Sequence, residues 1–451
     1  MNNQTRKALL ALVIISLFFG NRSQAQEALS LSQAIEMGLK NNFSIQIERN
    51  KQLQAANLNT WGQAGMFPNI TLNAAPSLSY QDTETDNPFR FGGSNTSTDL
   101  TPSLNANWTL FDGFNVQMSK QKLELLQGQS DGNAQIIVEN SVQSIILAYY
   151  TVLLEKERTE VFSKTLNLSR DRYEYMKLKG ELGSAVTFDI LIDKNAYLTD
   201  SSNYLTQVLN HKNAIRNLNL LLARPVDNNY QFSDSLAVQE TEFNLDELAA
   251  AMKGTNSNLK NQYINLEILQ RDIGIARSAL YPKLALNVTG SNGWNHVELG
   301  TPIGDASNPV SGINTTTLTL SANLTLSFTL FNGGKVKNQI ENARIQEQIG
   351  QLEIKDLELT LDNSLLSTFD RYNLRLRLNA IAAENLETAN LNLDLGEERY
   401  KNGSINSFNY RDLQITYLQT ALSYYQSIYN LIESKTELLR LTGGILSEQT
   451  K

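Results

Sequence analysis

The chain has 451 residues, no cysteine, 41% hydrophobic residues and a formal net charge of −8. The lack of cysteine excludes a disulfide framework, a cysteine-ligated zinc site, a thiol nucleophile and a lipid anchor carried on cysteine. The acidic excess argues against nucleic acid as a partner, because phosphate binding requires clustered Lys and Arg.

The first segment has the three parts of a secretory signal. Arg6 and Lys7 form a basic start, the apolar run Ala8 to Phe19 follows, and small and polar residues lead to Ala25. The apolar run is shorter than the roughly 18 residues that a membrane-spanning helix needs. We therefore predict a cleaved signal peptide over 1–25, which leaves a mature chain with a net charge of about −11.

The remaining chain contains two copies of one pattern. Segment 64–70, around Pro68, matches segment 278–284, around Pro282, at an offset of 214 residues, whereas 109–113 matches 329–333 at an offset of 220. Loops between these landmarks would absorb the difference. The match predicts a first repeat over 26–223, a link over 224–242, a second repeat over 243–443 and a tail over 444–451. Each repeat is expected to contain a helix, two strands and a helical hairpin.

Two long tracts without proline, 113–224 and 310–451, are rich in good helix formers. Gly183-Ser184 and Gly403-Ser404 interrupt them once each, as a helix stop followed by a candidate N-cap. We predict two helical hairpins, 114–180 with 185–222 and 334–401 with 405–442. At about 1.5 Å per residue the longer arms reach about 100 Å, which is longer than a globular domain.

Four segments, 69–80, 100–111, 284–294 and 317–330, alternate between apolar and polar residues. A soluble sheet would show the same alternation, but its wet face would normally carry Lys and Glu, whereas Thr, Ser and Asn suit a water-filled lumen. We predict membrane strands joined by loops at 81–97 and 295–314. The lipid face is expected to carry Leu104, Trp108, Leu320 and Leu324, and the lumen face Asn105, Asn107 and Asn323. Four strands cannot close a barrel, so oligomerisation must complete it.

This order of elements behind a signal peptide resembles the TolC-like outer membrane efflux protein (outer membrane factor) family, over about 29–443. The resemblance rests on the order and duplication of short motifs. They are the Phe-Pro and Tyr-Pro pairs at 67–68 and 281–282, the turns at 110–113 and 330–333, and the segments 148–153 and 399–404.

The resemblance implies an α+β membrane protein. Three protomers would pool four strands each into a twelve-stranded β-barrel in the outer membrane, continued by a long α-helical barrel of coiled-coil hairpins in the periplasm. It implies an exit channel of a tripartite efflux or type I secretion system. The expected partners are outer-membrane lipid, a periplasmic adaptor (membrane fusion) protein and an inner-membrane pump of resistance-nodulation-division or ABC type. The adaptor would contact the hairpin tips, at Gly183, Ser184, Ala185, Gly403, Ser404 and Ile405.

The family's gate pattern is only partly present. In that pattern, aspartates six and nine residues after the second-tip glycine form acidic rings that narrow the tunnel entrance. Here those positions hold Asn409 and Asp412, and the first repeat has Asp189 six residues after Gly183. Ile405 replaces an arginine that latches the tips. The resemblance therefore implies a closed entrance with one acidic ring and a weaker latch.

No constellation of an enzyme is visible, so we expect no catalytic residue, metal site or cofactor. The two histidines, His211 and His296, are interpreted as surface residues. Asp189 and Asp193 have helical i, i+4 spacing; this could indicate a metal or acid–base couple, but the polar face of a hairpin is the favoured interpretation. The alternative function is that of a non-channel periplasmic or secreted coiled-coil protein with a structural or adaptor role. The exported cargo stays open at this point.

Overall fold

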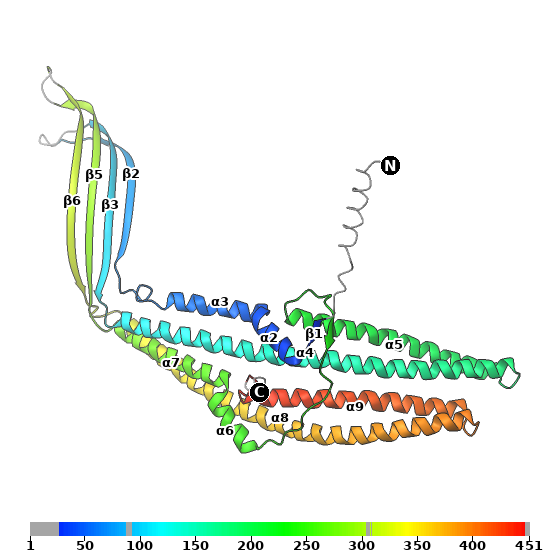
Figure 1. Ribbon diagram of the computed structural model, residues 1–451. Coiled ribbons are helices and arrows are strands. Elements are labelled where there is room, and N and C mark those ends of the chain that lie inside the picture. Colours follow the sequence, from blue (N-terminus) through cyan, green and yellow to red (C-terminus); the bar gives the residue numbers. More distant parts are fainter. Residues whose placement is uncertain (1–26, 87–92, 304–306, 308, 447–451) are drawn as a thin grey trace, which may run out of the picture. The chain divides into compact units, whose positions relative to one another are not determined.

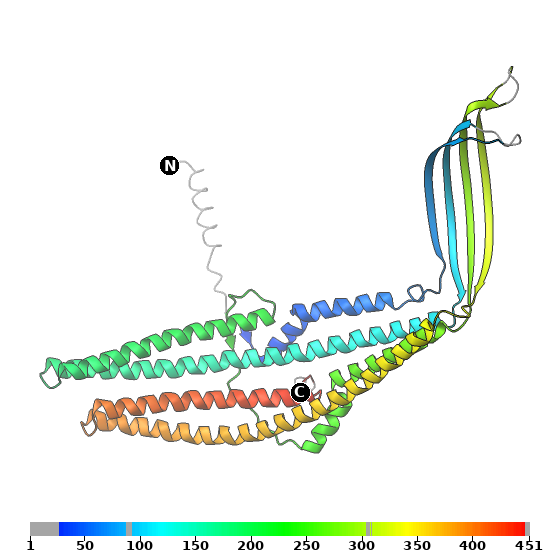
Figure 2. The same ribbon diagram turned by 180° about the vertical axis from the view of Figure 1, so that it is seen from behind.

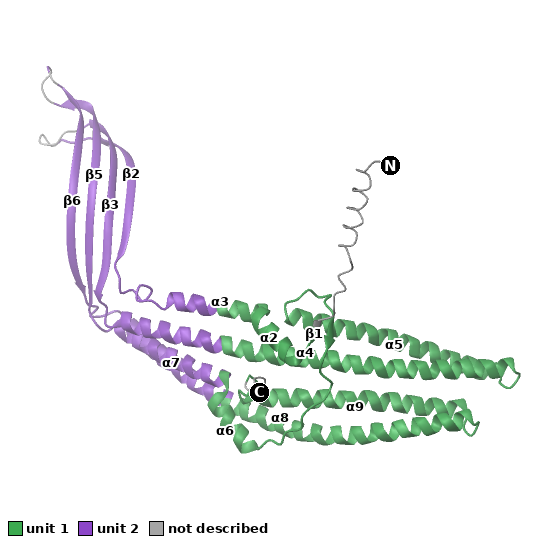
Figure 3. Ribbon diagram, in the orientation of Figure 1, with its two compact units in different colours: residues 1–49, 134–257, 358–451 green, residues 50–133, 258–357 purple. Residues whose placement is uncertain are grey.

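The computed structural model describes residues 27–86, 93–303, 307 and 309–446. The predicted signal peptide lies outside these residues. The fold is α+β, and the chain divides into two compact units (Figure 3). Unit 1 comprises 1–49, 134–257 and 358–451, and unit 2 comprises 50–133 and 258–357. Each unit is therefore built from segments of both repeats.

The elements follow the same order twice along the chain (Figures 1 and 2). The first series consists of β1 (Glu27–Leu29), α2 (Leu31–Asn41), α3 (Phe43–Leu58), β2 (Asn69–Thr83), β3 (Gly93–Phe111), α4 (Asn115–Glu181) and α5 (Thr187–Leu221). The second consists of β4 (Tyr230–Phe232), α6 (Leu245–Thr255), α7 (Ser257–Ser278), β5 (Lys283–Ile303), β6 (Val310–Ser327), α8 (Lys335–Lys401) and α9 (Ser407–Leu441).

The long helices have the lengths that the sequence predicts. Helices α4 and α8 have 67 residues each, and α5 and α9 have 35 each. At about 1.5 Å per residue the longer pair measure about 100 Å. Among the described residues, α4 also contains a window that is apolar enough to cross a membrane. Its side chains Val142, Ile145 and Tyr149 are fully buried within unit 1, so the composition reflects core packing.

The four long strands form an antiparallel sheet in unit 2, with strand order β2-β3-β5-β6. Its strands have 15, 19, 21 and 18 residues, longer than the predicted segments. The predicted loops were therefore too long, because most of 295–314 and the ends of 81–97 are strand. The alternation breaks down at these ends, where Val297 and Leu299 lie on the face that is polar elsewhere, although the backbone pairing continues. His296, predicted in a loop, lies in β5, where its Nδ1 is 2.7 Å from Asn314 Oδ1.

Two prolines occur inside this sheet, and both occupy positions that tolerate a missing N–H. Pro76 is on β2, an edge strand of the described sheet. Pro102 is on β3, where pairing with β5 stops at Leu100 and resumes at Ser103. The gap in pairing removes the need for a hydrogen-bond donor at this position.

In unit 1, a buried tyrosine joins the start of the described chain to the link. Tyr149 on α4 donates its hydroxyl to the carbonyl of Leu29, at 2.9 Å, and to Asp234 Oδ2, at 2.8 Å. The same carboxylate accepts the N–H of Leu31 at 2.8 Å. Strands β1 and β4 form a small parallel sheet beside this tyrosine. The sequence did not predict this sheet, because three-residue strands carry no periodic signal.

Corresponding asparagines make the same contact in the two repeats. Asn42, before α3, donates its amide to the carbonyl of Leu221, the last residue of α5, at 2.8 Å. Asn256, at the repeat offset of 214, donates to the carbonyl of Leu441, the last residue of α9, at 3.0 Å. Each asparagine satisfies a helix C-terminal carbonyl that has no partner within its own helix.

The turns between strand and helix place glycines in the left-handed region. Gly113 has φ +70° and Gly333 has φ +67°. A Cβ on Gly113 would lie 2.4 Å from the carbonyl oxygen of Ser278, whereas a Cβ on Gly333 would meet no atom within 4 Å. The two sites therefore share the backbone strain but differ in steric space.

We expect Gly113→Ala to destabilise unit 2 much more than Gly333→Ala. Both substitutions incur about 1 kcal/mol for the left-handed conformation, but only Gly113→Ala also forces backbone apart. Thermal unfolding of the purified variants in detergent would measure the difference. Equal melting temperatures would show that the close approach to Ser278 is not retained.

Candidate functional site

The four-stranded sheet has one apolar and one polar face. Strand pairing aligns Leu104 with Gly290 and Gly290 with Leu320, so that the predicted apolar residues form rows across the strands. The apolar face carries Leu72, Leu104, Trp108, Leu286, Leu320 and Leu324. The polar face carries Asn105, Asn107, Thr289, Ser321 and Asn323. The register thus separates the two predicted sets, while the assignment of lipid and lumen stays a prediction.

Two tryptophans lie near the two ends of the apolar face. Trp108 pairs with Leu286, and Trp294 lies eight residues further along the same strand and on the same face. At about 3.4 Å per residue this separation is about 27 Å along the strand. The side chains are 41% and 45% exposed in the single chain. Aromatic residues at both borders of an apolar band about 25 Å tall are typical of outer-membrane barrels.

Four asparagines form a continuous row across the polar face. Asn69 pairs with Asn107, Asn107 with Asn287, and Asn287 with Asn323. One row away, Thr289 Oγ1 donates to Asn105 Oδ1 at 2.9 Å. Carboxamides and hydroxyls offer donors and acceptors to water or a solute but carry no charge. The face therefore suits a hydrated passage.

Both hairpin tips end their long helix in the same way. Gly183 and Gly403 adopt φ values of +76° and +75°. The next N–H groups, of Ser184 and Ser404, donate to the carbonyl five residues earlier, at 2.7 and 2.8 Å. This is the bonding of a left-handed glycine cap. The predicted helix stops are therefore present at the predicted glycines.

The candidate N-caps were predicted wrongly. Helix α5 begins after Val186, which makes no side-chain cap bond, and α9 begins after Asn406, whose side chain accepts the N–H of Asn409 at 2.9 Å. Ser184 and Ser404 close the preceding helix through their backbone N–H groups, so each following helix starts two residues later than predicted. Of the predicted adaptor contacts, the glycines and serines are exposed and Ala185 and Ile405 are half-buried.

The predicted gate residues lie on two different hairpins. Asp412 and Asn409 are exposed and line a groove of about 330 Å³ between α8 and α9, together with Arg399 and Ile405. Asp189 lies on the first turn of α5 and is half-buried. The structure thus brings Asp412 and Asn409 together and leaves Asp189 on the other hairpin.

Asp193 is not on a solvated polar face, as the sequence suggested, but is 1% exposed between the two hairpins. Its Oδ1 is 2.9 Å from Nε of Arg172 on α4, whose side chain is equally buried. Ser407, the first residue of α9, donates its hydroxyl to both carboxylate oxygens, at 2.8 and 2.9 Å. Arg172 NH1 also donates to Gln414 Oε1 at 2.8 Å. Four side chains from three helices therefore form one buried polar cluster, in which Nη2 of Arg172 and Nε2 of Gln414 have no hydrogen-bond partner among the described residues.

A second ion pair lies further along the same interface. Both terminal nitrogens of Arg411 donate to the two oxygens of Asp200, at 2.7 and 2.8 Å. Asp200 is 3% exposed. The bidentate geometry compensates the carboxylate for lost water. Sequence analysis missed both pairs, because their members are about 20 residues apart or in different repeats.

Burial also shifts the pKa values of neighbouring groups. Burial, together with the nearby Asp193 carboxylate, raises the pKa of Tyr400 to about 12. Burial lowers the pKa of the Arg172 guanidinium from its ordinary value, against the attraction of Asp193. Tyr400 stacks on Tyr410, with ring centroids 4.9 Å apart. The charged groups therefore lie inside an apolar and aromatic cluster.

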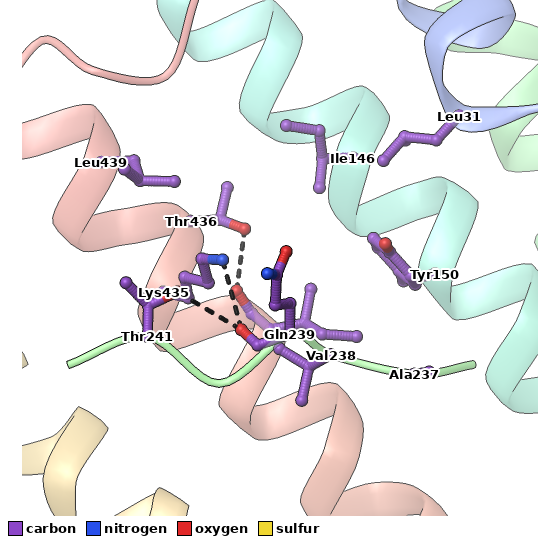
Figure 4. A pocket seen from close by; sticks show the side chains of 11 residues that line it. Leu31, Ile146, Tyr150, Ala237, Val238, Gln239, Thr241, Lys435, Thr436 and Leu439 are labelled. Atoms are coloured by element: carbon purple, nitrogen blue, oxygen red, sulfur yellow. Dashed lines mark hydrogen bonds between the residues drawn. The ribbon is translucent and has the colours of Figure 1, made fainter. Parts of the chain in front are cut away.

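A cavity of about 650 Å³ lies elsewhere in unit 1, where the link crosses between α4 and α9 (Figure 4). Link residues 237–241 form one wall, and Tyr150 and Thr436 lie on the others. The ammonium of Lys435 donates to the carbonyl of Gln239 at 3.3 Å. The lining residues supply no carboxylate or imidazole. In the described parts of the chain, no group of three or more His, Asp or Glu residues could hold a metal ion.

The ion pair predicts a coupled response to mutation. Arg172→Met should destabilise the helical part by about 3–5 kcal/mol, because it leaves a buried carboxylate without its cation. Arg172→Met combined with Asp193→Leu should recover most of the loss. Helical thermal unfolding in detergent would measure both, with Arg170→Met, at a half-exposed site, as the control. Additive effects of the two substitutions would contradict a coupled pair.

Residues 249–444 match the family model of the outer membrane efflux protein. No curated protein sequence matches the chain. The CmeC outer membrane channel of Campylobacter jejuni has a TM-score of 0.73 at 16% identity, covering 93% of this chain and 89% of its own. The open-state MtrE outer membrane channel of Neisseria gonorrhoeae has a TM-score of 0.70 at 16% identity, with 92% and 89% covered.

The outer membrane protein VceC of Vibrio cholerae has a TM-score of 0.69 at 14% identity, covering 92% of this chain and 96% of its own. At these identities the structural matches establish a shared fold over nearly the whole chain, and the sequence match covers the second repeat. Residues 249–444 therefore match the outer membrane efflux protein family, and the chain as a whole shares the fold of these outer membrane channels.

Proposed function

We propose that three copies of this chain form an exit channel in the outer membrane, with a twelve-stranded barrel and a periplasmic helical tunnel. The observation that carries the proposal is the four-stranded sheet, which has an apolar face bordered by tryptophans, a neutral polar face and two edge strands, β2 and β6. Such edges are not tolerated in lipid, so closure by further copies satisfies them. A non-channel coiled-coil protein would have no use for these strands.

The internal repeat predicts how the edge strands of neighbouring copies pair when the barrel closes. Asn69 pairs with Asn107 in the first strand hairpin, and Lys283 with Ser327 in the second. These pairs are related by the offsets 214 and 220 of the sequence repeat, so both hairpins have the same register. Strands β3 and β5 join the first repeat to the second within one chain. The equivalent joint between chains is β6 with β2 of the partner subunit.

Carrying the β3·β5 register across by the same offsets identifies facing residues. Asn105 pairs with Thr289 in one chain. The corresponding pair is Thr325 with Ala75 of the partner subunit. Both positions belong to the polar face, so the register keeps apolar and polar faces continuous around the barrel.

We expect a chain with Ala75→Cys and Thr325→Cys to form covalent trimers on mild oxidation. Directly opposite Cβ atoms lie about 4.5–5.5 Å apart, near the span of a disulfide, whereas diagonal neighbours lie about 7–8 Å apart. The matched control is Asn73→Cys with Thr325→Cys, and the native chain contributes no cysteine. Non-reducing gels of outer-membrane fractions give the result. Cross-linking of the control alone would shift the register by two residues, and a soluble monomer in both would refute the channel.

The channel would receive cargo from an inner-membrane pump of resistance-nodulation-division or ABC type through a periplasmic adaptor. The tips Gly183–Ala185 and Gly403–Ile405 are the proposed adaptor contacts. Their support is exposure: beside them Leu182 is 72% exposed and Phe188 is 66% exposed in the single chain. Exposed apolar side chains next to glycine caps fit a docking partner.

The proposed periplasmic gate contains one acidic ring, from Asp412, with Asn409 and Asp189 nearby along the tunnel. Its support is the exposure of Asp412 and Asn409 on the same side of α9. Three carboxylates around a narrow aperture attract divalent cations, and one ring holds them less tightly than two.

Planar-bilayer recordings with divalent cation on the periplasmic side test this gate. Asp412→Asn should relieve the block, and Asn409→Asp should deepen it by adding a second ring. Asp171→Asn, at an exposed position on α4, provides the control for a general loss of negative charge. An unchanged block in both gate variants would place Asp412 on the outside of the tunnel.

A further inference from the structure

The polar face of the sheet carries two charged side chains. Lys283 lies at one end of the face, and Asp99 lies further along it, next to the row of Trp294. Where the pairing is regular, strand alternation assigns the odd-numbered residues of β2, β3, β5 and β6 to this face. Among the described odd positions in these strands, Asp99 and Lys283 bear charge, and the rows between them contain Asn, Ser, Thr, Ala and Gly. This pattern leaves the middle of the face neutral.

The Asp99 carboxylate is held by its neighbours across three strands. Asn295 on β5 donates to Oδ1, and the hydroxyls of Ser97 and Ser77 donate to Oδ2 at 3.1 and 3.4 Å. Asn295 also donates to Ser97 Oγ at 2.8 Å. Donors stabilise the ionised form of the carboxylate, so the charge stays at a defined level of the face.

Lys283 lies at the end of the face beside the strand-to-helix turn. It is the first residue of β5, pairs with Ser327 and is exposed. None of the ion pairs in the described part of the chain includes Lys283. Twelve residues separate Lys283 from Asn295, the partner of Asp99, which corresponds to about 40 Å along the strand.

We propose that the barrel lumen carries a positive ring of three Lys283 ammonium groups at its periplasmic end and a negative ring of three Asp99 carboxylates nearer the outside of the cell, at the level of Trp294. The proposal rests on the trimeric channel proposed above. The outer ring enriches small cations and the inner ring enriches anions. Because the two zones are in series, the barrel rectifies ionic current.

The direction of rectification follows from which ions each ring admits. With the outer side positive, cations enter through the Asp99 ring and anions enter through the Lys283 ring, so both accumulate in the neutral middle and current is high. With the outer side negative, each ring opposes the ion that arrives, and the middle is depleted. Rectification depends on the salt concentration, because salt screens the charge of each ring. The Debye length is about 30 Å at 0.01 M salt and about 3 Å at 1 M.

The test is a planar-bilayer measurement of the cation-to-anion permeability ratio and of rectification in KCl. At about 0.01 M, Asp99→Asn should lower the permeability ratio about twofold, and Lys283→Gln should raise it by a similar factor. Rectification should weaken in each variant and vanish in the double variant. At about 1 M all differences should disappear.

Asp82→Asn is the matched control, because it removes the same charge near the same end but on the opposite face of the sheet. It should leave both quantities unchanged. Asp99→Asn combined with Thr101→Asp moves the carboxylate one row along the same face and should restore the cation preference. This second variant distinguishes loss of charge from a local defect in folding.

Three outcomes would overturn different conclusions. A conducting channel whose permeability ratio and rectification at low salt are the same in Asp99→Asn, Lys283→Gln and the wild type would refute the two rings and leave the exit channel standing. A folded trimer that forms no conducting pathway would refute the exit channel itself. A response to Asp82→Asn in place of Asp99→Asn would invert the assignment of the faces.

Discussion

Backbone pairing at the outer sides of β2 and β6 is the constraint on which the rest of the structure depends. These strands have 15 and 18 residues, and within the described chain each pairs along one side only. A bilayer offers no water to their remaining N–H and C=O groups, so the strands acquire partners from other copies or do not enter lipid. The alternation of faces, the tryptophan borders and the uncharged polar rows have a common explanation once the edges are closed.

The helical hairpins are constrained by a different interaction, which is the pairing of buried charges. Replacing a buried ion pair with apolar residues often costs no stability, but removing one partner is expensive. The pair Arg411–Asp200 joins the two hairpins directly. The pair Arg172–Asp193 lies within the first hairpin and is contacted from the second by Ser407. We therefore expect these charges to specify how the two hairpins pack within unit 1 more than they strengthen the packing. Any movement that separates α5 from α9 near the tips must expose or unpair Asp193 and Asp200. The hairpins of one chain are thus coupled through their carboxylates.

The sequence predicted the helices and the faces of the sheet, which follow from periodic patterns of residues. It missed the contacts between side chains that are distant in the sequence. The glycines at 183 and 403, the absence of proline and the repeat offsets predicted the helical hairpins to within two residues at each end. Alternation predicted the faces of the sheet. By contrast, Asp193 looked like a surface residue because Arg172 and Ser407 reach it only in the folded hairpins. The strand residues within 81–97 and 295–314 were assigned to loops, because the alternation of apolar and polar residues is not continued there.

The repeat also explains where the two strand hairpins differ. Their registers coincide at the helical end, where Asn69 pairs with Asn107 and Lys283 with Ser327. The six extra residues of the second repeat therefore lie further along the hairpin, where pairing is interrupted between Glu298 and Ile303. An insertion at this end costs little, since loop closure depends weakly on length. An insertion at the helical end would instead shift the register of β5 against β3. A shift by one residue would turn Lys283 and the asparagine row from the polar face to the apolar face.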